Sequence, residues 1–262
     1  MTMRRRTLTL GALAGVLARP AHAEELAPLP LQRVVTGDLP PLSIADQPTR
    51  PGVLVELVQE LLRRCQHETP ISFYPWARAM QMAQSLPGVA LLPLTRMPER
   101  EEQFQWLLRL YVQPLGFINL ASQPAITSLE QARRLRLAVL RGSAAHGMTQ
   151  RLQLDARMLV ISNSVEDQLR RLERGHVQGI FGSLMINQDK ARSHGREPGW
   201  LQVGMTVEAG EVWLATGPRT LVAEEHRQRL REALRAMFQD GSVERLFTRY
   251  GVKPPRAEEL LR

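Results

Sequence analysis

The segment "LLPLTRMPER", residues 91–100, places a hydroxyl and two guanidinium groups directly after an apolar, strand-like run. Thr95, Arg96 and Arg100 supply these groups. A guanidinium stays charged at working pH and offers a planar fork of N–H donors that matches a carboxylate. A hydroxyl can add a further hydrogen bond to the same group. The segment therefore predicts an anion site, and the alternative is a surface loop in which Arg100 pairs with one of the glutamates that follow it.

Two other segments carry polar or aromatic groups suited to holding a small solute. In "LRGSAAHG", Gly142 and Ser143 follow a predicted strand and begin a helix, where free backbone amides attract anions; Ser143 could equally serve only as the helix N-cap. In "FYPWARAM", Tyr74 and Trp76 could line a cleft, and Arg78 would add a second cation. The alternative for Trp76 is a place in the core between its helix and a sheet.

The elements that must position these residues alternate between strands and helices. Residues 31–94 predict the order β-α-β-α-β, because period-two apolar runs alternate with helical apolar spacing. The alternation resumes over residues 128–195, one more strand is predicted at 211–217, and two helices close the chain over 222–251. This order predicts an α/β fold in two units, with a cleft at the carboxyl ends of the strands.

Residues 1–23 are typical of an export signal. They begin with three consecutive arginines, continue with an apolar stretch, and end in Ala21-His22-Ala23. The apolar stretch of about ten residues is shorter than the ~20 residues that a helix needs to span a bilayer, which argues against a membrane anchor. We therefore predict a periplasmic protein, exported by either the general or the twin-arginine route.

Charge and motifs exclude several classes of function. The formal charge of +8 falls to +4 without residues 1–23, which contain four arginines and no acidic residue. The remaining arginines alternate with glutamates along helices, without an aromatic-laced basic stripe, which argues against nucleic acid as a partner. The sequence contains no H-x-x-x-H, H-E-x-x-H, G-x-S-x-G or phosphate-loop motif, so we expect no metal, cofactor or catalytic group. The single Cys65 is expected to be a packed core residue.

The order of several segments resembles the family 3 extracytoplasmic solute-binding proteins. These segments are "VVTGDLPPLS", "GVLVELVQELLRRC", "LLPLTRMPEREEQFQWLLRLY", "RLAVLRGS" and "LREALRAMFQDGSVERLFTRYGV". The "YPW-x-R-A" element is similar to a poorly characterised branch of this family. The resemblance implies the type II periplasmic-binding-protein fold, in which lobe 2 is inserted into lobe 1. Lobe 1 would comprise residues 24–112 and 211–262, and lobe 2 residues 113–210, with crossings near Val112–Pro114 and Gly210–Val212.

The resemblance also implies roles for individual residues. Arg100 would bind the carboxylate of the ligand, Thr95 would donate a hydroxyl hydrogen bond, and Pro93 would lie where the family uses a backbone carbonyl. Gly142 and Ser143 would hold the other side of the same carboxylate. Arg96 would be solvated.

The sequence departs from the family pattern where an amino-acid ligand would place its ammonium group. Ser183 stands at about the position of the usual acidic residue, with no carboxylate nearby, and Leu39 replaces the aromatic residue of the first loop. Asp38 could replace the missing ammonium partner, or it could be only a turn residue before proline. The departure favours a carboxylate or other small anion that need not carry an α-amino group.

These observations predict a monomeric solute-binding protein that closes over a small carboxylate-bearing molecule and delivers it to an ABC permease in the membrane. Two alternatives remain open. One is a sensory or accessory ligand-binding protein without a transport role, and the other is a small dehydratase-like enzyme.

Overall fold

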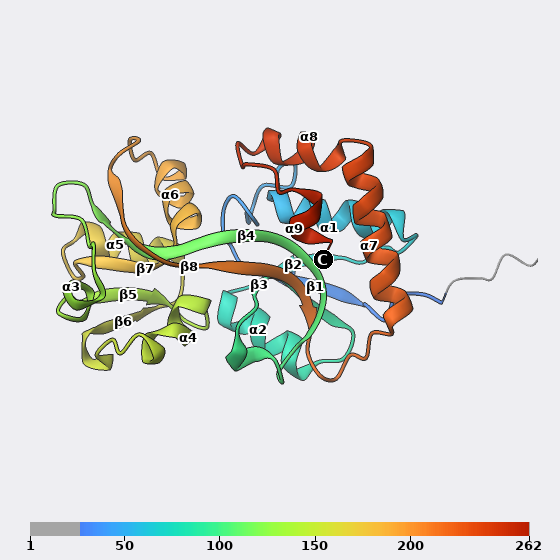
Figure 1. The fold of residues 1–262 in the computed structure, drawn as a ribbon, viewed down its shortest axis with the longest axis horizontal. Helices are drawn as coiled ribbons and strands as arrows, with labels where there is room; N and C mark the ends of the chain where they lie inside the picture. Colours follow the sequence, from blue (N-terminus) through green and yellow to red (C-terminus); the bar gives the residue numbers. More distant parts are fainter. Residues whose placement is uncertain (1–26, 262) are drawn as a thin grey trace, which may run out of the picture.

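The computed structural model describes residues 27–261, so the export signal predicted for residues 1–23 lies outside the described residues. Two lobes lie side by side, and two long strands run through both of them (Figure 1). These strands are β4 (Gln105–Leu120) and β8 (Leu201–Thr216), each of sixteen residues. The two-lobe α/β architecture predicted from the sequence is therefore confirmed.

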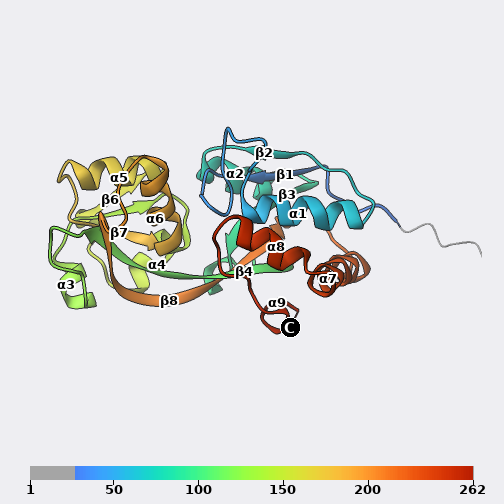
Figure 2. The ribbon, with the colours of Figure 1, turned by 90° about the horizontal axis from the view of Figure 1, so that it is seen from above.

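Lobe 1 is built from both ends of the described chain (Figure 2). Its strands and helices are β1 (Arg33–Thr36), α1 (Val53–Arg64), β2 (Ile71–Phe73), α2 (Trp76–Ser85), β3 (Val89–Thr95), α7 (Glu224–Gln239), α8 (Ser242–Arg249) and α9 (Ala257–Leu260). Helices α1 and α8 lie on one side of the sheet and α2 lies on the other. Helix α1 forms because its apolar residues recur at helical spacing, and all seven of its buried residues are Val or Leu.

The sheet of lobe 1 brings the ends of two strands to one edge. Its strand order is β2-β1-β3-β8-β4. Strand β1 pairs in parallel with β2 and β3, and Val34 lies opposite Ala90. Because the carboxyl ends of parallel strands meet at the same edge, Gly37 after β1 and Thr95 at the end of β3 both face the junction between the lobes.

Lobe 2 repeats the pattern with its own layer of parallel strands. Its elements are α3 (Leu129–Arg133), β5 (Leu137–Leu140), α4 (Ala144–Arg151), β6 (Leu159–Ser162), α5 (Val165–Glu173), β7 (Gly179–Ser183) and α6 (Leu184–Ser193). Strand β5 pairs in parallel with β6 and β7, and β7 pairs antiparallel with β4. Helices α4, α5 and α6 each begin just after a strand ends, so their first turns lie at one edge of this sheet.

Strands β4 and β8 stay paired with each other along their length, but their other neighbours change where they cross between the lobes. Gln113 lies opposite Gly210 at this point. On one side β8 pairs with β3 from Val212 onward, and on the other β4 pairs with β7 from Leu115 onward. We propose the lobe boundaries at residues 112/113 and 210/211 on this basis. The strand predicted at 211–217 was too short, because residues 201–210 are also extended and pair with β4. Their apolar residues recur at every second position, a strand signal that the prediction did not use.

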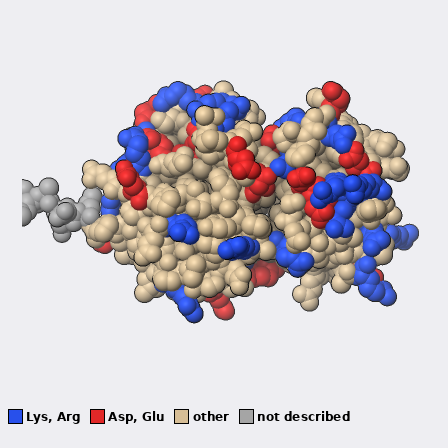
Figure 3. Space-filling model, turned by 180° about the vertical axis from the view of Figure 1, so that it is seen from behind, with Lys and Arg blue, Asp and Glu red and all other residues tan. Residues whose placement is uncertain are grey.

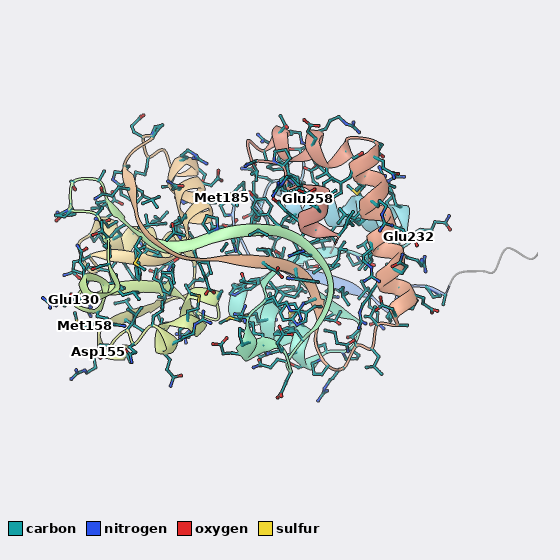
Figure 4. The ribbon with its side chains drawn as sticks, in the orientation of Figure 1. Glu130, Asp155, Met158, Met185, Glu232 and Glu258 are labelled. Atoms are coloured by element: carbon teal, nitrogen blue, oxygen red, sulfur yellow. The ribbon has the colours of Figure 1, made fainter. Side chains whose placement is uncertain are left out.

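The apolar cores of the lobes touch across the junction. Leu140, Val165 and Ile186 from lobe 2 belong to the buried cluster of lobe 1, and Met97 of lobe 1 belongs to a buried cluster of lobe 2. Met185 of α6 lies at the junction (Figure 4) and packs against the lobe 1 cluster. The structure is therefore a closed arrangement of the two lobes.

Candidate functional site

A cavity of about 50 Å³ lies between the closed lobes. Lobe 1 contributes Leu39, Trp76, Pro93, Thr95 and Arg100 to its wall. The crossing strand contributes Gln113 and Leu115, and lobe 2 contributes Leu140, Ser143, Ala144, Ala145, Val165, Gln168, Gly182, Ser183, Ile186 and Asn187. The structure thus brings together Pro93, Thr95, Arg100, Trp76, Ser143 and Ser183 from the predicted site residues.

Arg100 is the charged residue of this wall, and it is buried. It ends a short 3-10 turn that follows β3 (η1, Pro98–Arg100), and only 6% of it is exposed. Its Nη1 donates to the carbonyl oxygen of Thr95 at 2.9 Å, and its Nη2 donates to the carbonyl oxygen of Gly142 at 2.7 Å. Within residues 27–261, no carboxylate lies within ion-pair distance of this guanidinium. The alternative predicted from the sequence does not occur, because Glu101 pairs with Arg96 instead, at 2.8 Å.

Burial changes the electrostatics of Arg100. Loss of solvent lowers the pKa of its guanidinium to about 10, against a small opposing effect of Glu99. The guanidinium therefore stays charged at neutral pH. The lowered pKa means that its charged form is about 3 kcal/mol less stable, relative to the neutral form, than it would be in water. A carboxylate that enters the cavity would offset this cost, because it would supply the missing counter-charge.

Gly142 connects the two lobes through its carbonyl group. This oxygen accepts from Arg100 and also from Trp76 Nε1, at 3.1 Å, and both donors belong to lobe 1. Gly142 has a φ of +73°, and a Cβ there would lie 3.2 Å from the Met80 sulfur in lobe 1. A glycine therefore permits both the backbone conformation and the close approach of the lobes.

The amides predicted to hold an anion at this turn are occupied in the structure. The Gly142 N–H donates to His146 Nδ1 at 3.1 Å, and the Ser143 N–H donates to the carbonyl of Leu140 at 3.0 Å. The Ser143 hydroxyl accepts from the His146 N–H at 3.1 Å, which makes it the N-cap of α4. In this structure Gly142 contributes its carbonyl to the lobe contact, and its amide donates to the His146 ring; a contact of this turn with a carboxylate stays a prediction.

The hydrogen bond between the Gly142 amide and His146 Nδ1 predicts that folding stability depends on pH. Burial lowers the pKa of His146 from its usual 6.5, and Arg141 and Arg100 lower it further. Because the folded protein holds this ring neutral, folding stability should fall as pH drops below about 6.5, by at most about 1.4 kcal/mol per pH unit. Melting temperatures between pH 7.5 and 5 should show a smaller acid loss in His146→Gln. Equal acid losses in the two proteins would contradict this reading.

Gln113, on the crossing strand β4, links the walls of the cavity. Its Oε1 accepts from the hydroxyl of Ser183 at 2.7 Å, and its Nε2 lies 3.5 Å from the hydroxyl oxygen of Thr95. Ser183 also caps α6. The hydroxyl groups of Thr95 and Ser183, from opposite lobes, are therefore positioned through one buried amide.

Four predicted site residues are not in the cavity wall: Gly142, described above, and Asp38, Tyr74 and Arg78. Asp38 accepts the N–H of Ala45 and pairs with Lys190 of lobe 2 at 2.5 Å, so it contributes a second contact between the lobes. The Arg78 guanidinium lies over the Tyr74 ring, 5.4 Å from its centroid. Asp38 thus takes part in a contact between the lobes, and Arg78 and Tyr74 pack on each other. None of the three side chains lines the cavity.

Two buried amides of the wall, Gln168 and Asn187, were missed by the sequence reasoning. Gln168 interrupts the apolar face of the helix "SVEDQLRRLERG", between Val165 and Leu169. A polar residue at a position of that face is the signal that could have identified it. Asn187 on α6 gives a weaker signal, because the apolar spacing of that helix is poor.

The cavity wall described by the structure carries one cation and no anion. Figure 3 shows basic and acidic side chains intermixed on the rear face of the two lobes. Within residues 27–261, no group of three or more His, Cys, Asp or Glu side chains could hold a metal ion. None of the helices in this part of the chain has the length and apolarity to cross a membrane.

No protein-family model and no curated protein matches this sequence. Similar solved structures nevertheless cover most of the chain. A histidine kinase sensor domain with similarity to periplasmic binding proteins has a TM-score of 0.75 at 20% identity, covering 86% of this chain and 98% of that one. The arginine-, lysine- and histidine-binding protein ArtJ from Geobacillus stearothermophilus has a TM-score of 0.74 at 13% identity, with coverages of 87% and 98%.

The ligand-binding core of GluR0 from Nostoc punctiforme, in complex with L-glutamate, has a TM-score of 0.69 at 14% identity, with coverages of 84% and 98%. Similarity at these identities establishes the fold. The predicted type II periplasmic-binding-protein fold is thereby confirmed.

Proposed function

We propose that this chain is an extracytoplasmic solute-binding protein that closes its two lobes over a small, carboxylate-bearing molecule. The observation that carries the proposal is the state of Arg100, which is buried, charged and without an acidic partner among the described residues. A buried charge is usually paired, so the cavity is expected to receive its counter-charge from a ligand. Pro93, Thr95, Trp76, Ser143 and Ser183 would complete the binding site.

Closure would couple binding to a change of shape. Arg100 and Trp76 of lobe 1 contact Gly142 of lobe 2, and Asp38 contacts Lys190, only when the lobes are together. A ligand held by both lobes stabilises this closed state relative to an open one. The crossing strands near Gln113 and Gly210 would serve as the hinge.

We further propose that the closed form delivers its solute to an ABC permease, and that the protein acts as a periplasmic monomer with a removable signal at residues 1–23. The cavity wall within the described residues includes no Asp, Glu, His or Lys that could act as an acid–base pair, which favours binding over dehydratase-like catalysis. A sensory role would use the same closure. A similarly folded structure is a sensor domain, and a direct assay for complex formation with a permease distinguishes the two roles.

A thermal-shift screen of the mature protein tests the binding proposal. Small carboxylates should raise its melting temperature, because they bind the folded state only. Polyamines and other purely cationic compounds at the same concentration should leave it unchanged. Stabilisation by cations without stabilisation by carboxylates would refute the charge argument.

A further inference from the structure

Two buried amide side chains that line the cavity from lobe 2 each have a polar atom without a hydrogen-bond partner. Gln168 on α5 is 1% exposed and Asn187 on α6 is 2% exposed, and both line the cavity. Within the described residues, Gln168 Nε2 and Asn187 Oδ1 make no hydrogen bond. Asn187 Nδ2 donates to the carbonyl of Ser183 at 2.9 Å, which fixes the orientation of its amide and leaves Oδ1 as a free acceptor.

Such atoms are unusual in a folded protein. More than about 90% of buried polar groups have a hydrogen-bond partner, because an unsatisfied one loses its hydration without compensation. Arg100 in lobe 1 is similar, because its buried charge has no acidic partner among the described residues. The unmatched groups are therefore a cation on one lobe and a neutral donor and acceptor on the other, around a single cavity.

The chemistry of the lobe 2 groups favours a hydroxyl over an ammonium. An ammonium group only donates, so it could satisfy Asn187 Oδ1 but not the N–H of Gln168 Nε2. It would also bring a positive charge beside Arg100, with no carboxylate in the described wall to balance it. A hydroxyl accepts and donates through one oxygen atom, so it can accept from Gln168 and donate to Asn187.

The size of the cavity limits the ligand further. A volume of about 50 Å³ corresponds to only a few water-sized groups, since one such group needs roughly 10–15 Å³. A carboxylate and one hydroxyl on a short carbon chain would fill this space. A carboxamide in place of the hydroxyl would bring both an oxygen and a nitrogen and would therefore need more room.

We infer that the ligand is a small hydroxy acid. Its carboxylate pairs with Arg100 of lobe 1, and its hydroxyl lies between Gln168 and Asn187 of lobe 2. The inference rests on the function proposed above and specifies the substrate class of the same site. Gln168 and Asn187 are then the residues that determine specificity, in the place where a carboxylate would be needed for an amino acid.

Calorimetric titration with two matched sets of acids tests the inference. The sets are glycolate, glycine and acetate, and lactate, alanine and propionate, which differ within each set only in the group on the α-carbon. In at least one set the hydroxy acid should bind at least tenfold more tightly than both its amino and its unsubstituted counterpart. Equal or tighter binding of the amino acid would overturn the inference while leaving the proposed function intact. Absence of binding by all six would overturn both.

Exchange of one atom at Gln168 gives a second, independent test. Gln168→Glu keeps the shape of the side chain but places a carboxylate at the cavity, so the preference should shift at least tenfold from hydroxy acid toward amino acid. The matched control is Gln150→Glu, which makes the same charge change at an exposed position of α4 outside the cavity wall and should leave the preference unchanged.

Gln168→Met keeps the test decisive if the glutamate variant does not fold. This variant removes the donor, so hydroxy-acid affinity should fall to within about threefold of that of the unsubstituted acid, while the acid itself still binds. An unchanged preference in every folded variant of Gln168 would overturn the assignment of this residue to specificity.

Discussion

Replacement of Arg100 by alanine is expected to weaken carboxylate binding at least tenfold, a loss of about 1.4 kcal/mol or more. The physical reason is that the variant removes the only charged partner that the described cavity wall offers to a carboxylate, in a place from which water is excluded. Arg100→Lys should recover part of the affinity, since it restores the charge without the planar fork of donors. Isothermal titration calorimetry with the best carboxylate from the screen measures each affinity.

The matched control for this prediction is Arg96→Ala, which removes a guanidinium from the same loop outside the cavity. Arg96 pairs with Glu101 and lies over the rings of Trp106 and Trp213, at 5.4 and 5.0 Å from their centroids. Its removal should leave the affinity within about twofold of wild type. Equal losses in Arg100→Ala and Arg96→Ala would remove Arg100 from the site.

The variant Trp76→Phe separates the pairing of Arg100 with the ligand from the contact between the lobes. It removes the other donor to the Gly142 carbonyl and keeps an aromatic ring in the cavity wall.

Introduction of a bulky residue at Gly147 is expected to hold the lobes apart. Gly147 lies in α4 of lobe 2, and a Cβ there would lie 2.9 Å from the terminal carbon of Met97. Met97 belongs to lobe 1 but is 5% exposed and packed among lobe 2 residues. Its flexible end can shift to admit a Cβ alone, so the expected effect comes from the bulk of an indole, which would displace Met97 even though position 147 is itself partly open to solvent. Gly147→Trp should therefore weaken ligand binding at least tenfold, although residue 147 does not line the cavity.

The control variant is Gly147→Ala, which also removes the helix penalty of glycine, about 1 kcal/mol relative to alanine, but adds a much smaller side chain. It should bind ligand more tightly than the tryptophan variant. Small-angle scattering should show that ligand makes the wild type more compact and leaves Gly147→Trp extended, while circular dichroism shows both variants folded. A tryptophan variant that contracts with ligand and binds as tightly as wild type would disprove a role for this contact in closure.

The order of elements was predictable because apolar spacing reports directly on local structure. The helix at Val53–Arg64 and the strand at Val89–Thr95 both follow from residues whose periodicity matches the element that forms. Strand β8 was predicted only over its last part. Residues 201–210 also carry a strand signal, because the apolar residues Leu201, Val203, Met205, Val207 and Ala209 alternate with polar or small ones. The prediction missed this signal, and the partner of this segment, β4, lies about ninety residues away in sequence.

The lining of the candidate site was predictable where one local segment carries the polar groups. Thr95 and Arg100 follow the end of a buried strand, and strand ends are where such folds place their ligands. Asp38 could not be assigned from its own loop, because its partner Lys190 lies in the other lobe. The opposite wall was also hidden, since Gln168 and Asn187 come from separate helices and meet at the cavity only through the packing of lobe 2.

A crystal structure of the mature protein with its best-binding carboxylate tests the central claim most directly. We predict a closed protein in which the ligand carboxylate lies within hydrogen-bond distance of the Arg100 guanidinium, between the lobes. A carboxylate bound elsewhere on the protein, or a ligand whose amine rather than its carboxylate faces Arg100, would contradict the account.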